Sequence, residues 1–202
     1  MAIDPTPPGT APSLREVGPL SAVGLPNGLA SDHQGHLYYA ATGLLVPGSV
    51  HRVTLSGTAA VVSDVVAIQH LLENPNGLKI GAGHLYVGTD PVLFLGMTRV
   101  LRYPLSASGP GLWPTVIATS AGLYDDFTLV ADGGLLAAEF LLGQVRRVDE
   151  ASGLVTASLA VAQPTSATVV ASASCGERAV LVTRRSAGAV DVFTDAWGLE
   201  PR

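Results

Sequence analysis

LPNGLA at residues 25–30 and NPNGLK at residues 74–79 are two copies of one pattern, and LYDDFT (123–128) and QPTSAT (163–168) are weaker copies. Each copy is a turn that leads into a short apolar strand, a hairpin and a second apolar strand. The spacing is 49 residues from Asn27 to Asn76, 50 from Asn76 to Asp126, and 39 from Asp126 to Thr165. Units of about 40–50 residues are typical of four-stranded propeller blades. The repeat therefore predicts an all-β chain, a β-propeller of about four blades with four antiparallel strands each.

The repeat also predicts the domain organisation. We expect a flexible lead-in followed by one propeller domain. The boundaries are residues 1–19 for the lead-in, 20–202 for the domain, and about 20–62, 63–118, 119–160 and 161–202 for the blades. A two-sheet sandwich also uses many short strands, but it does not require self-similarity at a fixed period. The repeat therefore favours the propeller.

The composition excludes several classes of function. Hydrophobic residues make up 48% of the chain and charged residues 13%, which suits a large core rather than disorder. The net charge is −5 and Lys79 is the only lysine, so no basic stripe can neutralise phosphates and we expect no nucleic-acid partner. No apolar run reaches the roughly eighteen residues that span a bilayer, so we expect no membrane insertion. The single cysteine, Cys175, cannot form an intrachain disulfide. These features are compatible with a soluble protein, either cytoplasmic or secreted with its signal removed.

Catalytic motifs of several common kinds are missing from the sequence. It contains no Gly-x-Ser-x-Gly elbow, no zinc-type spacing of His and Cys, and no phosphate-binding glycine loop. Two carboxylates, Asp90 and Glu139, follow apolar strands at comparable places in successive units. They could line the mouth of the central channel or cap a strand end in water, and we favour the second interpretation.

The four turns, in their order and spacing, resemble successive blade openings of the gluconolactonase family, which includes regucalcin (senescence marker protein). The similarity covers roughly residues 20–195. Members of that family are six-bladed propellers that hold a divalent metal, often calcium, at the mouth of the central channel. The resemblance thus implies that the chain corresponds to the last four blades of such a propeller.

The resemblance also implies a set of site residues. It places Asn27, Asn76 and Asp126 at metal-ligand positions, and it makes Asp126 the general base for lactone hydrolysis as well. Amide and carboxylate oxygens are hard ligands that suit calcium, with magnesium, manganese or zinc as alternatives. Such a metal would polarise a carbonyl and acidify a bound water. The alternative is that the three side chains only supply turn geometry.

The chain departs from the family in its length. A six-bladed propeller needs on the order of 280 residues, and this chain has 202. The first two blades, and the Glu ligand that belongs to the first, have no counterpart; we interpret Glu16 as an ordinary exposed charge. The chain could be a fragment of a longer protein, could be completed by another chain as a homo-oligomer, or could close as a smaller ring.

Two functions follow from these observations. The first is metal-dependent hydrolysis of a lactone or small ester, for which the apolar stretches at 44–49 and 91–97 predict a hydrophobic rim. The second is a non-catalytic binding or scaffold propeller, or an inactive fragment that lacks the first two blades and the Glu ligand. The retained Asn27, Asn76 and Asp126 favour the first function, and the missing Glu favours the second.

Overall fold

The computed structural model is built from β-strands. It describes residues 2–3, 14–15, 24–32, 34–43, 48–56, 59–67, 73–91, 96–171, 178–185 and 188–194. Those ranges contain no helix, and hence none long and apolar enough to cross a membrane. The all-β prediction is confirmed.

Four antiparallel sheets follow one another along the chain. The first contains β3 (Leu25–Ser31), β4 (His36–Thr42), β5 (Ser49–Ser56) and β6 (Ala59–Ala67). The second contains β7 (Glu73–Gly81), β8 (His84–Pro91) and β9 (Thr98–Ser106), with β11 (Thr115–Ser120) and the short β10 (Gly109–Pro110) both paired to β9. The third contains β12 (Tyr124–Leu129), β13 (Gly134–Glu139), β14 (Gln144–Asp149) and β15 (Val155–Ala160). The fourth contains β16 (Pro164–Ala171), β17 (Arg178–Arg184) and β18 (Ala189–Thr194). A separate two-residue pair joins β1 (Ala2–Ile3) to β2 (Leu14–Arg15).

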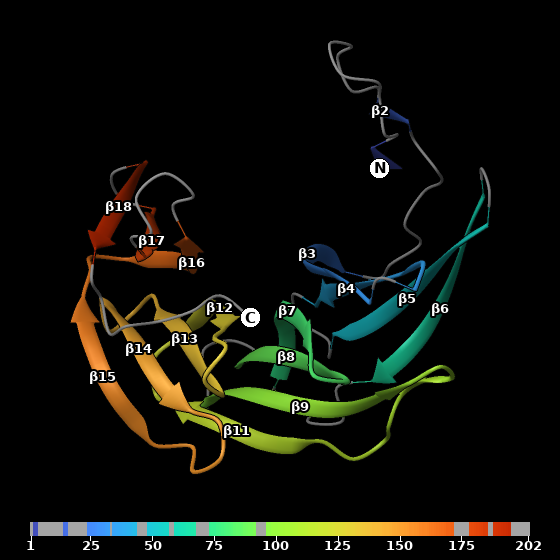
Figure 1. Cartoon of the computed structure of the whole chain (residues 1–202). Helices are drawn as coiled ribbons and strands as arrows, with labels where there is room; N and C mark the ends of the chain where they lie inside the picture. The colour runs from blue at the N-terminus through green and yellow to red at the C-terminus, as the bar shows by residue number, and fades with distance from the viewer. Residues whose placement is uncertain are drawn as a thin grey trace.

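The sheets are arranged as blades of a β-propeller. Figure 1 shows them fanned around a common centre in an open arc, with the first strand of each sheet innermost and the last strand outermost. The inner strands contact one another in chain order, β3 with β7, β7 with β12, and β12 with β16. The propeller prediction is therefore confirmed.

Apolar side chains fill the three spaces between successive sheets. Tyr38, Ala40 and Val50 of the first sheet pack with Leu78 and Val87 of the second. The next two spaces repeat this arrangement with residues of the same kinds. The second and third sheets contribute Tyr86, Val100, Phe127, Leu135 and Ala137, and the third and fourth contribute Leu136, Val145, Ala167, Val180 and Val182. Each inner sheet thus has two buried faces, as the nearly continuous apolar second strands predict.

Every inner strand carries a register shift at the repeated turn. The shifts lie between Pro26 and Leu29, Pro75 and Leu78, Tyr124 and Asp126, and Pro164 and Ser166. Such a β-bulge places an extra residue against the partner strand and re-aims its side chain. The motif that marks the repeat in the sequence is therefore the residue pair that forms the bulge.

The register also refines the match between the blades. Leu78 pairs with Val87, and Phe127 pairs with Ala137, which makes Leu78 and Phe127 equivalent. Counting back two residues makes Asp125 the equivalent of Asn76, whereas Asp126 corresponds to Gly77. The spacing in the sequence pairs Asp126 with Asn76, and the register shows that this alignment is one residue out.

Candidate functional site on the inner strands

Asn76 links two carboxylates at the bulge of the second blade. It is only 6% exposed, and its Nδ2 donates a hydrogen bond of 2.5 Å to Asp90 Oδ2. The Asn76 side chain also favours the charged form of Asp125, which occupies the bulge of the next blade. The other Asp90 oxygen, Oδ1, is buried and has no hydrogen-bond partner among the described residues. One amide thus joins carboxylates from two blades, and one carboxylate oxygen stays available.

The environment of these carboxylates disfavours their charged forms. Burial raises the pKa of Asp90 to about 7, and the nearby charge of Asp125 adds to the rise against the hydrogen bond from Asn76. Burial also raises the pKa of Asp125, and the charge of Asp126 acts in the same direction. The hydrogen bond from Asn76 and the charge of Arg185 oppose that rise. Crowded carboxylates whose pKa values move toward neutrality are typical of functional sites, although structural networks produce the same effect.

Asp126 is held by side chains from both neighbouring blades. Its Oδ1 accepts a hydrogen bond of 2.8 Å from Lys79 Nζ on β7, and its Oδ2 accepts one of 3.0 Å from Ser166 Oγ on β16. Lys79 also lies over the ring of Phe127, 5.6 Å from its centre. The only lysine of the chain is therefore the counter-ion of the carboxylate predicted to be catalytic.

Close approach of the inner strands depends on two glycines. A methyl group at Gly77 would come within 2.7 Å of Asp126 Oδ1, and one at Gly28 would overlap the Asn76 carbonyl oxygen and lie 2.6 Å from the Leu78 amide nitrogen. The glycine that follows Asn27 and Asn76 in the sequence motif is thus needed for packing between blades.

Asn27 occupies the bulge of the first blade but lies in a more open position. It is exposed, and its Nδ2 is 3.5 Å from Thr42 Oγ1. Thr42 and Asp90 hold the same place in their blades, so the contacts of Asn27 and Asn76 are versions of one repeated hydrogen bond. We call Asn76, Lys79, Asp90, Asp125, Asp126 and Ser166 the axial cluster; Asn27 lies one blade further along the same ring.

Two further carboxylates are buried in ion pairs away from the bulges. Glu139 is fully buried, and its Oε2 forms an ion pair with Arg146 Nε at 2.8 Å and accepts a hydrogen bond from Gln144 Nε2 at 2.7 Å. Glu73, 5% exposed, pairs with Arg99 at 3.2 Å. The interpretation of Glu139 as a strand cap in water is therefore wrong, because its side chain is fully buried and paired with Arg146 on the adjacent strand. The register matches Glu139 to Thr89 rather than to Asp90.

The described residues do not form a metal centre of the usual composition. No group of three or more His, Cys, Asp or Glu side chains within those ranges is arranged to hold a metal ion. The nearest approach to one is the mixed set of Asn76, Asp90 and Asp125. Glu16 and Cys175 lie outside the described residues.

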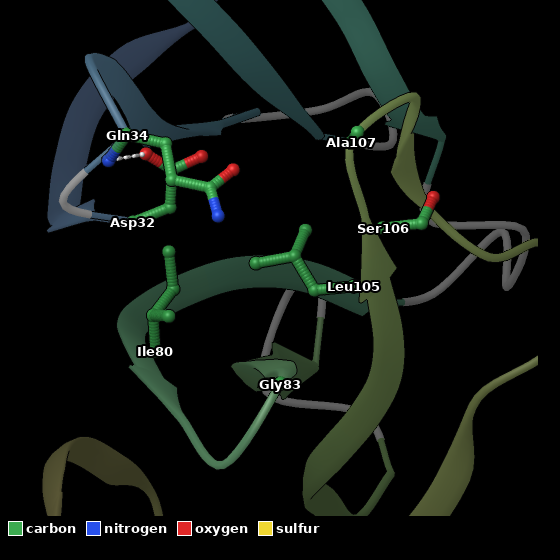
Figure 2. A pocket seen from close by; sticks show the side chains of 7 residues that line it. All are labelled: Asp32, Gln34, Ile80, Gly83, Leu105, Ser106 and Ala107. Atoms are coloured by element: carbon green, nitrogen blue, oxygen red, sulfur yellow. Dashed lines mark hydrogen bonds between the residues drawn. The ribbon is translucent and has the colours of Figure 1, made fainter.

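A small cavity lies at the C-terminal ends of β3 and β7, beyond the bulges that these strands carry. Figure 2 shows its lining, with Ile80 and Leu105 facing the side chains of Asp32 and Gln34. Its volume is about 280 Å³. Asp32 already accepts hydrogen bonds from the backbone amides of Gln34 and His36 and contacts His36 Nδ1 at 2.6 Å. Its carboxylate therefore stabilises the hairpin, and the axial cluster remains the better candidate for chemistry.

No model of a known protein family matches the sequence, and no curated protein is similar to it. Solved structures do share its fold. A candidate 6-phosphogluconolactonase from Bacteroides uniformis has a TM-score of 0.59 at 16% identity, over 85% of this chain and 54% of its own. The dihydro-heme d1 dehydrogenase NirN has a TM-score of 0.58 at 18% identity, over 84% and 35%. A protein of unknown function from Bacteroides caccae has a TM-score of 0.56 at 12% identity, over 84% and 61%.

These likenesses establish the propeller fold and leave the chemistry open. The chain spans between 35% and 61% of the length of the three structures, all at low identity. The specific gluconolactonase-type site therefore remains a prediction, and the chain is shown to be an all-β, four-bladed propeller arc.

Proposed function

We propose that the chain is a lactonase-like hydrolase that opens a lactone or small ester at the axial cluster. The observation that carries this proposal is the gathering of Asn76, Asp90, Asp125 and Asp126 on the second and third blades, where Asn76 hydrogen-bonds Asp90 and Lys79 of the second blade pairs with Asp126 of the third. The choice of substrate class is supported by the similar folds from Bacteroides uniformis and Bacteroides fragilis, both candidate 6-phosphogluconolactonases.

Asp126 is the proposed general base. Its Oδ2 already accepts a hydrogen bond from a hydroxyl group, that of Ser166, at 3.0 Å, which is the geometry a carboxylate needs to take a proton from water. Lys79 provides the counter-charge on the opposite oxygen.

The donor set fits a hard divalent cation such as calcium. Asp90 Oδ1 is buried without a hydrogen-bond partner among the described residues, and two carboxylates crowd around one amide. Asn76, Asp90 and Asp125 would hold the cation, with Asn27 and Asp126 as the further predicted ligands. When bound, such a cation polarises an ester carbonyl and lowers the pKa of a coordinated water.

The test combines activity with a binding measurement. After treatment with EDTA, the purified chain is assayed on glucono-1,5-lactone and p-nitrophenyl acetate, and its thermal unfolding is followed as calcium chloride is added. We expect calcium to raise the unfolding temperature of the wild type but not of Asp90→Asn. We expect Asp126→Asn to lower the hydrolysis rate by about a hundredfold or more.

Asp149→Asn is the matched control, because Asp149 is the last residue of β14 and its side chain hydrogen-bonds Ser152 in the hairpin that follows. It should keep both the activity and the calcium response. Hydrolysis that is unchanged in Asp126→Asn, or no hydrolysis of either substrate, would remove the enzymatic proposal.

A second candidate is a non-catalytic binding propeller, and the Lys79–Asp126 ion pair favours it. That pair neutralises the predicted base without a metal. Lys79→Met separates the two candidates. If Asp126 is catalytic, removing its counter-ion should lower the hydrolysis rate of an active wild type. A non-catalytic propeller should show no hydrolysis in either form, and Lys79→Met should change only its unfolding temperature.

A further inference from the structure

The turn between β13 and β14 carries two exposed leucines. Leu141 is 59% exposed and Leu142 is 49% exposed. The turn is fixed to the neighbouring strand, because the Phe140 amide donates a hydrogen bond of 2.8 Å to the Leu123 carbonyl oxygen. Tight turns usually place Gly, Asn, Asp, Ser or Pro at such positions, so the turn itself does not require leucines. The two side chains are therefore candidates for a contact outside the fold.

Met97 extends this apolar surface to the second blade. It is 43% exposed, and it directly precedes Thr98, whose Oγ1 donates a hydrogen bond of 2.6 Å to the Gly122 carbonyl oxygen. Leu142 packs on the same glycine, since a methyl group at Gly122 would lie 3.0 Å from Leu142 Cγ and Cδ1. Side chains from two blades thus gather near residue 122. We call Met97, Leu141 and Leu142 the apolar shelf.

The apolar shelf lies at the end of the sheets that holds the axial cluster. Asp90 is the penultimate residue of β8, and the connection that ends at Met97 follows it. Asp125 lies in the bulge opposite the last two residues of β13, just before the turn that carries the leucines. Arg185 is close to both regions, because its charge favours the ionised form of Asp125 and its guanidinium lies 5.9 Å from the centre of the Phe140 ring.

The shelf and the axial cluster suit different parts of a ligand. Methionine and leucine side chains donate no hydrogen bonds, so sugar hydroxyl groups placed on the shelf would lose water without gaining a partner. An alkyl chain placed there would instead bury apolar area. Exposed apolar surface beside a few polar groups is typical of ligand sites. The arrangement therefore favours a substrate with a polar reacting group and an apolar tail.

We propose that the preferred substrate is a lactone that carries an alkyl chain, with its ring at the axial cluster and its chain on the apolar shelf. This proposal rests on the hydrolase function proposed above and names its substrate class. In the reaction, water adds its oxygen to the carbonyl carbon and the ring C–O bond breaks. The ring oxygen takes the proton that Asp126 removes from the water, so the product is a hydroxy acid with its alkyl chain unchanged.

Hydrolysis of γ-lactones that carry methyl, butyl or hexyl groups tests this proposal. We expect kcat/KM to rise about twofold per added methylene, or about thirtyfold from methyl to hexyl, because a half-buried methylene gains about half of the full transfer free energy. Met97→Ser and Leu141→Ser should each lower the hexyl-to-methyl ratio of kcat/KM at least about threefold. Leu154→Ser should keep that ratio, because Leu154 is 66% exposed in the β14–β15 hairpin, at the other end of the sheet. Circular dichroism verifies that each variant is folded.

Two results of the kinetic assay would overturn the proposal and leave the hydrolase function intact. The first is hydrolysis with equal kcat/KM for the methyl and hexyl lactones. The second is a chain-length preference that neither Met97→Ser nor Leu141→Ser changes, because the chain would then lie elsewhere.

Calorimetric titration with the products, 4-hydroxypentanoate and 4-hydroxydecanoate, gives a readout that does not depend on turnover. We expect the longer product to bind at least about tenfold more tightly than the shorter one. If neither lactone is hydrolysed but this difference in binding is found, the hydrolase function fails and the shelf is supported as the site of the alkyl chain. If neither product binds, or both bind equally, the shelf does not hold an alkyl chain and the proposal is overturned.

Discussion

Replacing Asp90 with asparagine should stabilise the protein at alkaline pH and leave it nearly unchanged at acidic pH. Burial and the charge of Asp125 raise the pKa of Asp90 from an ordinary value of 3.8 to about 7. The folded chain therefore keeps this proton up to a pH at which the unfolded chain has lost it. The stabilisation that this proton gives the folded wild type is fully present below pH 4 and is lost as the pH rises toward 7. Asparagine keeps an oxygen that can accept the hydrogen bond from Asn76 but cannot ionise.

The size of the pH-dependent gain in stability follows from the rise in the pKa of Asp90 on folding. Each pKa unit corresponds to about 1.4 kcal/mol, so the rise from 3.8 to about 7 sets a ceiling of about 4 kcal/mol on the pH-dependent gain. Partial access of water to Asp90 should reduce the gain to about 2 kcal/mol, which corresponds to roughly 4–8 °C in unfolding temperature for a chain of this size.

Urea unfolding from pH 4 to pH 8, in EDTA, measures this effect. The stability of Asp90→Asn should exceed that of the wild type increasingly as the pH rises. The stability contributed by Asp149 should depend on pH in the opposite direction, because hydrogen bonds from Ser152 hold the pKa of Asp149 below its ordinary value. Asp149→Asn should therefore lose stability relative to the wild type above pH 4. If the free energies of unfolding of the wild type and Asp90→Asn changed with pH in parallel, Asp90 would not be a crowded, buried carboxylate with a raised pKa.

Two other substitutions test the packing and the buried charge. Gly28→Ala should destabilise the chain by about 1–3 kcal/mol in urea unfolding, because the methyl group overlaps the backbone of Asn76, whereas Gly111→Ala meets only ordinary contacts at 3.6 Å and should be nearly neutral. Arg146→Met should cost about 3–5 kcal/mol by leaving Glu139 charged and buried, and adding Glu139→Gln should recover most of that loss. Equal stabilities of the single and double variants would show that the charge of Glu139 is not the cause.

The sequence predicts the blades well because the repeat is local. A turn, an apolar strand and a hairpin recur within a few residues, and each has a backbone requirement that Asn, Gly and Pro meet. The same locality explains the alignment error in the third blade. Asp125 and Asp126 are chemically identical in the sequence, and only the pairing of Phe127 with Ala137 shows which one occupies the bulge.

Contacts between blades are less accessible to sequence reasoning. Lys79 and Asp126 are 47 residues apart, and neither has a local signal that indicates the other. Glu139 follows an apolar strand, as an exposed strand cap does, and its burial becomes clear only once Arg146 is placed on the adjacent strand. Val190 is 57% exposed, whereas the valines at the same register position in the earlier sheets, Val50, Val100 and Val145, are buried. The sequence does not reveal this difference, because all four residues are valines.

The chain-order contact of the inner strands also has a consequence for folding cooperativity. The second and third sheets each pack against two neighbours, whereas within the described residues the first and fourth pack against one sheet each. In such a nearly one-dimensional array, local opening begins at the ends and moves inward. Amide hydrogens of β8 and β13 should therefore exchange more slowly than those of β4 and β17.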